Sequence, residues 1–154
     1  MILGFLFLAL IVGGAATHAT PASQSIYDGK ADAASDIRGA VGQASRQHKN
    51  VVLVFGANWC GDCHALDEQM HRPELASLIA KNYVVVKIDV GRFDKNVALA
   101  EKYHVPLEQG IPAVAVLDSR GKLLHAQEQG EFANARQMDA AAFQAFFKQW
   151  KPKG

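Results

Sequence analysis

The sequence predicts an α/β domain with a central mixed sheet of about four strands flanked by helices. Three observations predict this fold. Short apolar runs with strand character alternate with longer stretches of helical periodicity. Residues 119–122, after the third apolar run, have the composition of a hairpin turn. The last helical stretch carries four aromatic side chains on one face. Such alternation indicates a parallel strand pair with crossover helices, and the hairpin adds antiparallel strands.

The predicted elements follow in chain order. A helical pattern at 33–48 precedes a strand at 51–55, whose continuous apolar run is typical of burial on both faces. A helix starts at about residue 60, and Pro73 ends or kinks it. The remaining elements are a helical stretch at 75–79, a strand at 83–88, a helix at 97–103, strands at 113–117 and 122–126, and a helix ending near residue 150.

The beginning of the chain resembles an export signal, although it lacks a basic residue. Residues 1–16 carry no charge, and small residues follow where a signal peptidase would cut. The apolar stretch is shorter than the roughly 20 residues that span a bilayer. We therefore predict a signal peptide at 1–19, a linker at 20–32 and one domain at 33–150. The protein is expected to be periplasmic or secreted, without stable membrane insertion after cleavage.

Charge and cysteine content narrow the function. The net charge is +1 and no basic stripe is visible, so nucleic acid is not an expected partner. The two cysteines, Cys60 and Cys63, are separated by only two residues. A structural disulfide stabilises most when it closes a long loop, and a domain of this size does not depend on so short a bridge. The pair is therefore predicted to be chemically active.

The hexapeptide that runs from Trp59 to His64, WCGDCH, fits two chemistries. C-x-x-C is a redox dithiol, whereas C-x-x-C-H is the attachment signature of a c-type haem. The haem interpretation would use Cys60, Cys63 and His64, with Met70 or Met138 as a further ligand. Against it, the motif directly follows a buried strand, and the sheet pattern leaves no obvious helices to enclose a haem.

Zinc is a weaker interpretation of the same residues. Its ligands would be Cys60, Cys63, His64 and His71, which all come from one helix and its end. Structural zinc sites normally join two separated clusters. We therefore predict no metal and no cofactor.

Six features of the chain match one known superfamily. They are the strand at 51–55, the Trp-Cys-Gly-Asp-Cys that opens a helix, the strand that ends Lys87-Ile88-Asp89, the Gly110-Ile111-Pro112 before another strand, the hairpin around Gly121 and the amphipathic last helix. Over residues 33–150 the chain therefore resembles the thioredoxin superfamily, and in particular its exported members. The resemblance implies a thioredoxin-like fold.

The resemblance also implies residue roles. Cys60 would be the exposed nucleophile, because a helix N-terminus favours its thiolate. Cys63 would resolve the mixed disulfide. Pro112 would be the family's cis-proline beside the dithiol, with the backbone of Ile111 docking an extended substrate. Trp59 would be the aromatic shield of the site.

Three residues of the motif are expected to tune its redox poise. Gly61 and Asp62 form the dipeptide between the cysteines, and His64 follows them. A negative neighbour disfavours the Cys60 thiolate, so Asp62 favours a reductase-like poise. A protonated His64 would partly oppose it.

One position departs from the thioredoxin pattern. The buried acid that typical thioredoxins carry six residues before the first cysteine is Val54 here. Lys87 matches the lysine that pairs with that acid, so it is expected to lack its partner and to be a surface lysine. Asp67, one helical turn after Cys63, is the candidate substitute, and a solvated surface acid is the open alternative.

The sequence therefore predicts a thiol–disulfide oxidoreductase of the protein-disulfide reductase type. Its expected partners are disulfide-containing protein substrates and an upstream thiol electron donor. A c-type haem protein and a non-catalytic binding module of the same fold are the alternatives, and the intact dithiol argues against the second.

Overall fold

The central sheet has four strands, as predicted. They are β1 (Asn50–Gly56), β2 (Tyr83–Asp89), β3 (Ala113–Leu117) and β4 (Leu123–Ala126), in a computed structural model that describes residues 25–153. Their order in the sheet is β2-β1-β3-β4. β1 and β2 are parallel, β3 is antiparallel to β1, and β4 is antiparallel to β3. The predicted parallel pair and antiparallel hairpin are both confirmed.

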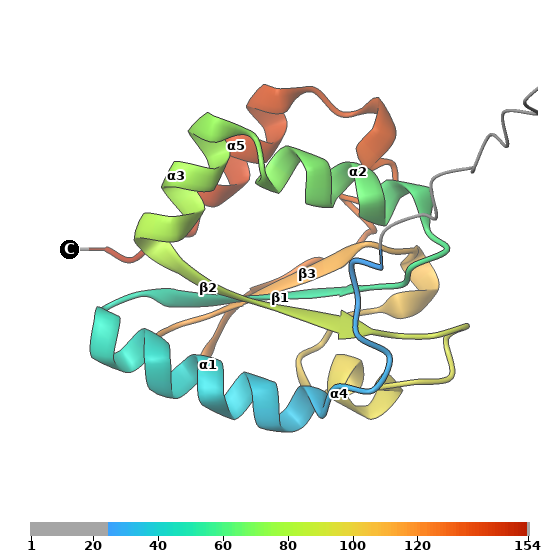
Figure 1. Ribbon diagram of the computed structural model, residues 1–154, viewed down its shortest axis with the longest axis horizontal. Helices are drawn as coiled ribbons and strands as arrows, with labels where there is room; N and C mark the ends of the chain where they lie inside the picture. Colours follow the sequence, from blue (N-terminus) through green and yellow to red (C-terminus); the bar gives the residue numbers. More distant parts are fainter. Residues whose placement is uncertain (1–24, 154) are drawn as a thin grey trace, which may run out of the picture.

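Helices cover both faces of this sheet (Figure 1). The α-helices are α1 (Ala33–Gln47), α2 (Gly61–Met70), α3 (Pro73–Asn82), α4 (Val97–Lys102) and α5 (Ala140–Gln149), and the 3-10 helices are η1 (Leu107–Gln109) and η2 (Ala135–Gln137). α1 and α4 lie on one face, whereas α2, α3 and α5 lie on the other. The α-helices match the predicted ones within a few residues. The 3-10 helices were not predicted, because a single short turn carries no readable periodicity.

β1 is buried along its whole length and separates two apolar clusters. Val51, Leu53 and Phe55 pack in the cluster that contains α1, whereas Val52 and Val54 pack in the cluster that contains α2, α3 and α5. Successive side chains of a strand point to opposite faces, and both faces are covered here. Burial on both faces explains the continuous apolar run. Because β1 is held in the core along its length, its end is fixed close to the start of α2.

Pro73 separates α2 from α3. It is the first residue of α3, where its missing N–H would have no helical partner in any case. Arg72, directly before it, has an extended backbone. The predicted interruption is therefore a complete break, and α2 is a separate helix of 10 residues.

The aromatic stripe of the last helix packs against the sheet. Asp139 begins α5 by accepting a hydrogen bond from the backbone N–H of Ala142 at 2.8 Å. Phe143 and Phe147 are fully buried, and Phe146 packs against the same cluster. This helix closes the face of the sheet that also carries α2 and α3.

The segment before α1 lies against the domain. Of the stretch predicted as a linker, residues 25–32 are described, and Tyr27 within it is 2% exposed and belongs to the α1-side core. The predicted signal peptide at 1–19 lies outside the described residues. Within 25–153, no helix is both long enough and apolar enough to cross a membrane.

Candidate active site

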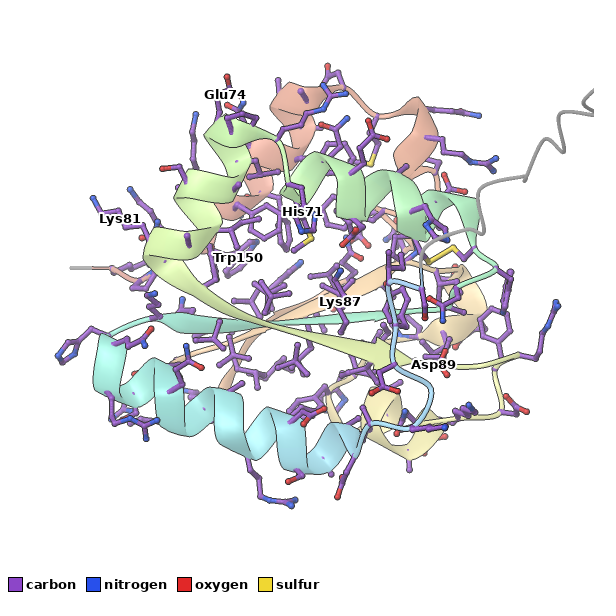
Figure 2. All side chains as sticks on the ribbon, in the orientation of Figure 1. His71, Glu74, Lys81, Lys87, Asp89 and Trp150 are labelled. Atoms are coloured by element: carbon purple, nitrogen blue, oxygen red, sulfur yellow. A yellow bond between two sulfur atoms is a disulfide. The ribbon has the colours of Figure 1, made fainter. Side chains whose placement is uncertain are left out.

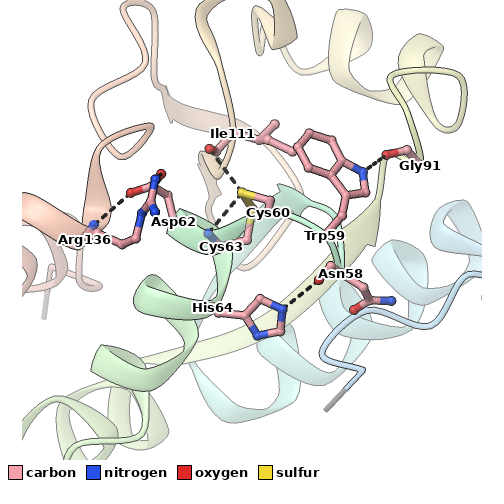
Figure 3. Close-up of a disulfide and its surroundings, with 9 residues drawn as sticks. All are labelled: Asn58, Trp59, Cys60, Asp62, Cys63, His64, Gly91, Ile111 and Arg136. Atoms are coloured by element: carbon pink, nitrogen blue, oxygen red, sulfur yellow. Dashed lines mark hydrogen bonds and ion pairs between the residues drawn. A yellow bond between two sulfur atoms is a disulfide. The ribbon is translucent and has the colours of Figure 1, made fainter. Parts of the chain in front are cut away.

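The two cysteines form a disulfide at the start of α2 (Figure 3). Cys60 is the N-cap residue, with an extended backbone, and its Sγ accepts a hydrogen bond from the N–H of Cys63 at 3.1 Å. The carbonyl oxygen of Cys60 accepts from the N–H of His64 at 3.2 Å. The sulfur of Cys60 therefore occupies the position that an N-cap oxygen normally takes, where the helix dipole is positive.

Both sulfur-bearing residues are largely buried in this disulfide form. Cys60 is 5% exposed and Cys63 is 1% exposed. Cys60 is thus the more accessible of the two, as the resemblance implied, but the expectation of an exposed residue is not met. The loop before β3 covers it, since the carbonyl oxygen of Ile111 lies 3.5 Å from Cys60 Sγ.

That loop carries the Ile111–Pro112 pair beside the disulfide. The peptide bond between the two residues is cis, and both are buried. Gly110, directly before them, has φ +107°, a backbone conformation that favours glycine. The Gly-Ile-Pro triplet, more than 40 residues from the dithiol in sequence, is therefore brought to it by the pairing of β1 with β3.

Trp59 lies at the open side of the site and is 47% exposed. Its indole N–H donates a hydrogen bond to the carbonyl oxygen of Gly91 at 2.7 Å. Phe93 packs edge-on against the indole ring at 5.9 Å between centroids, and the Arg92 guanidinium lies 5.1 Å from the ring centre. The loop after β2 thus holds Trp59 in place. Sequence reasoning assigned no role to this loop.

Asp62 forms an ion pair with Arg136 of η2 (Figure 3). The backbone N–H of Arg136 donates to Asp62 Oδ1 at 2.9 Å, and the guanidinium donates to Oδ2 at 3.1 Å. Partial burial alone would raise the pKa of Asp62, but the two hydrogen bonds and the charge of Arg136 outweigh burial and hold the pKa below its usual value. Arg136 was missed because 74 residues separate it from Asp62.

Asp67 forms an ion pair with Lys87 of β2, and both side chains are partly buried. Figure 2 shows Lys87 on the strand that also ends at Asp89. The surface assignment of Lys87 was wrong. Lys87 lies opposite Val54 in the sheet register, so the strand acid is absent, but its counter-charge comes from α2 instead. The Asp67 carboxylate also lies 3.6 Å from Nδ1 of His71.

His64 and Asn58 connect α2 to the segment before it. Nε2 of His64 lies 2.7 Å from the backbone oxygen of Asn58, and the Asn58 side chain bonds the backbone of Ile26 and Tyr27. This leaves His64 on the flank of α2 opposite Asp62 in the close-up (Figure 3). Asn58 was not singled out from the sequence, where it read only as part of a strand-ending turn.

Comparison with known proteins identifies the family. Residues 32–119, more than half of the chain, match the family model described as thioredoxin-like. The chain belongs to the thioredoxin-like family. A disulphide isomerase from Xylella fastidiosa Temecula1 has a similar structure, with a TM-score of 0.79 and 45% sequence identity, over 83% of this chain and 98% of that one. The thioredoxin-like fold predicted from the sequence is thus confirmed.

The match to curated relatives covers only part of this thioredoxin-like chain and only part of each relative. The protein disulfide-isomerase of Zea mays is 32% identical over 83 residues, which are 52% of this chain and 15% of that protein. Thioredoxin-1 of Drosophila yakuba is 40% identical over 57 residues, 37% of this chain and 49% of that protein. The chain thus spans only part of the curated relatives it matches.

These relatives, with the Cys60–Cys63 disulfide, support a thiol–disulfide oxidoreductase. The haem interpretation needed both sulfurs as thioethers, but in the structure they are bonded to each other. Of its two candidate methionines, Met70 packs in the core and Met138 packs against it. The zinc interpretation placed Cys60 and His71 in one site. They lie at opposite ends of α2, which is about 15 Å long.

Proposed function

We propose that this thioredoxin-like protein reduces or exchanges disulfide bonds in partner proteins. The observation that carries the proposal is the Cys60–Cys63 disulfide at the N-terminus of α2, with the Ile111 carbonyl 3.5 Å from the more accessible sulfur. A helix N-terminus favours a thiolate, and a carbonyl beside the sulfur can accept a backbone N–H from an extended substrate. Reactive sulfur and docking backbone therefore lie in one place.

The cycle begins with the reduced dithiol. The Cys60 thiolate attacks one sulfur of the substrate disulfide, which forms a mixed disulfide and releases the other substrate sulfur as a thiolate. The Cys63 thiolate then attacks Cys60 Sγ, the Cys60–Cys63 bond forms, and the second substrate sulfur leaves as a thiolate. The substrate gains two electrons, the dithiol loses two, and an upstream thiol donor restores it.

The substrate would dock along the apolar rim, which consists of Trp59, Phe93 and Val97. All three side chains are exposed although they are large and apolar. Leu107 and Gly110 border a hollow of about 360 Å³ together with Phe93 and Val97. This arrangement supports a substrate segment that is extended at Ile111 and places an apolar side chain over the rim.

We propose that the Cys60–Cys63 dithiol has a reductase-like redox poise. The dithiol is less reducing than Asp62 alone would make it. A carboxylate between the cysteines disfavours the Cys60 thiolate, which makes the dithiol more reducing. Arg136 offsets part of that charge, since it pairs with Asp62 and also lies 3.4 Å from the position a Gly61 Cβ would take. His64 lies on the other flank of α2.

Export remains part of the proposal. It is supported by the uncharged apolar residues 1–16 and the small residues after them. Expression of the full chain in bacteria, followed by fractionation and mass measurement, should find a periplasmic protein that lacks its first 16 to 19 residues. A full-length cytoplasmic protein would contradict this assignment.

The activity is tested by reduction of insulin with dithiothreitol as the donor. The full chain should accelerate the reaction, and Cys60→Ser should abolish that acceleration. In cells, Cys63→Ser should accumulate mixed disulfides on Cys60, because the resolving thiolate is gone. A protein that shows no cysteine-dependent reduction would instead be a binding module, and the absence of adducts on Cys60 would reject it as the nucleophile.

A further inference from the structure

The tyrosine before α1 lies at the rear of the dithiol. Tyr27 is 2% exposed and shares a core cluster with both cysteines. Gly56, the last residue of β1, shows how close they are. A Cβ placed on Gly56 would lie 2.6 Å from Cζ of Tyr27, the carbon that bears the hydroxyl, and 2.8 Å from Sγ of Cys63. Phenol and sulfur therefore border the same small space above Gly56.

Asn58 fixes the tyrosine in this place. Its Oδ1 accepts hydrogen bonds from the backbone N–H groups of Ile26 and Tyr27, each at 2.9 Å. Its Nδ2 donates to the carbonyl oxygen of Tyr27 at 2.9 Å and to Ser25 Oγ at 3.0 Å. Four hydrogen bonds from one side chain thus hold residues 25–27 against the turn that leads into the dithiol.

The surroundings of the phenol keep it protonated. Burial, with the negative charges of Asp67 and Asp89, raises the pKa of Tyr27 far above its usual value. Each of these carboxylates has a cationic partner, Lys87 for Asp67 and Lys95 for Asp89. The hydroxyl is therefore a hydrogen-bond donor throughout the physiological pH range.

We propose that Tyr27 is a positioning residue for the resolving cysteine, and that its hydroxyl donates a hydrogen bond to the Cys63 thiolate once the disulfide is reduced. This inference rests on the proposed function. A hydrogen bond to the charged form lowers the pKa of the thiol that receives it. In the cycle, Tyr27 would thus raise the fraction of Cys63 that attacks Cys60 Sγ. From the opposite face of β1, it would take over the role that the resemblance gives to an acid at the position of Val54.

The expected effect on rate can be estimated. If removal of the hydroxyl raises the pKa of Cys63 by about one unit, the thiolate fraction at neutral pH falls about tenfold. The less acidic thiol is also a better nucleophile, by roughly threefold per unit. Release of the mixed disulfide should therefore slow by about threefold, with little change in the first attack by Cys60.

The test uses Tyr27→Phe, which keeps the ring and removes only the hydroxyl. In a Cys60→Ala background, the carbon chemical shift of Cys63 Cβ is followed against pH to obtain the pKa of the single thiol. Tyr27→Phe should raise this pKa by about one unit. Asn58→Ala, which frees the segment but keeps the hydroxyl, should move it in the same direction.

Tyr83→Phe is the matched control. Tyr83 is also buried, and its hydroxyl donates to the carbonyl oxygen of Phe147 at 2.7 Å, on the other side of the sheet. It should leave the Cys63 pKa unchanged. An unchanged pKa in Tyr27→Phe, or an equal shift in Tyr83→Phe, would overturn the proposal. The titration needs no substrate, so a failure to reduce insulin would reject the proposed function without deciding this inference.

Discussion

The carboxylate of Asp67 on α2 pairs with the ammonium group of Lys87 on β2 across the space beside Val54. The acid of this pair lies on a helix and the lysine on a strand, whereas the resemblance placed the acid on the strand next to that of the lysine. The apolar Val54 side chain fills the strand position, and α2 supplies the charge one turn after Cys63. The pair therefore joins the dithiol helix to the edge strand of the sheet.

Loss of this pair should cost stability. Asp67→Asn leaves the partly buried Lys87 without its counter-charge, and we expect the free energy of unfolding to fall by about 1–2 kcal/mol, between the values for exposed and buried pairs. Urea unfolding measures it. Glu68→Gln is the control, because Glu68 pairs only with exposed Arg72 at 3.8 Å and should change stability by less than about 0.5 kcal/mol. Equal losses in both variants would contradict the assignment.

Asp62 and Arg136 should shift the reduction potential in opposite directions. Arg136→Ala leaves Asp62 unpaired and disfavours the Cys60 thiolate, so the potential should fall by on the order of 10–30 mV. Asp62→Asn should raise it, and Asp62→His should raise it further. Equilibration with glutathione gives these values. The double variant should lie near the parent protein, and additive shifts in one direction would refute the coupling.

The Asp62–Arg136 pair should also make stability depend on pH. Because the folded-state pKa of Asp62 is depressed, the ionised carboxylate stabilises the fold at pH values above 3.8, its ordinary pKa, and this contribution is lost as the pH falls through the depressed value. The difference in unfolding free energy between the parent and Asp62→Asn should therefore be constant at neutral pH and shrink in strong acid.

Asp118 provides the comparison for that measurement. Partial burial would raise its pKa, but hydrogen bonds from the backbone N–H groups of Lys122 and Arg120 lower it. The difference in unfolding free energy between the parent and Asp118→Asn should shrink in strong acid in the same way. It should leave the reduction potential unchanged, because the hairpin turn lies away from the dithiol. A shift of potential in this variant would show that stability, not local charge, moves the redox equilibrium.

Gly56 should tolerate no side chain. A Cβ there would collide with the Tyr27 ring and with Cys63 Sγ, so Gly56→Ala should lower the free energy of unfolding by about 1–3 kcal/mol, as overpacked cores do. Gly39→Ala is the control. Gly39 lies in α1 with nothing within 4 Å of its added Cβ, and alanine favours a helix over glycine. The midpoint temperature of thermal unfolding should fall in Gly56→Ala and rise in Gly39→Ala.

Phe93 should affect substrate binding more than chemistry. Phe93→Ala removes part of the apolar rim and the edge contact that holds Trp59, so KM for a disulfide peptide with an apolar residue beside its cysteine should rise about three- to tenfold. The kcat should change little, since the exposed Phe93 side chain packs on Trp59. Leu124→Ala, which truncates a similarly exposed side chain on β4, should alter neither constant. A drop in kcat alone would place Phe93 in the reaction itself.

The sequence predicted the sheet and the motif because both are local signals. The apolar run of β1, the break at Pro73 and the aromatic stripe of α5 follow from spacing alone. The pairing of the dithiol with Ile111 and Pro112 came from the family resemblance, and the carbonyl oxygen of Ile111 lies 3.5 Å from Cys60 Sγ. The strand, the helix break and the aromatic stripe need no knowledge of long-range contacts.

The missed residues act across long sequence distances. Arg136 reaches Asp62 from a 3-10 helix, and Tyr27 reaches Cys63 from a segment that read as a linker because of its polar composition. The partner of Lys87 was missed because the resemblance places the acid that pairs with this lysine on the strand. Asp67 was considered as a partner of the Cys63 sulfur or as a surface acid, but not as a partner of Lys87. Periodicity predicts which face of a helix or strand is buried, but it does not predict which distant side chain contacts that face.

The hydrogen bonds from Asn58 to residues 25–27 show that the part of the chain around the dithiol begins before the first helix. The family match begins at residue 32 and α1 at Ala33, so both exclude Tyr27. A shortened chain cut at the first helix would keep both cysteines, the cis-proline loop and the whole sheet, but it would lose Tyr27, which packs in the same core cluster as both cysteines. Trimming this protein to the matched domain would therefore remove a buried aromatic ring that borders the inner sulfur.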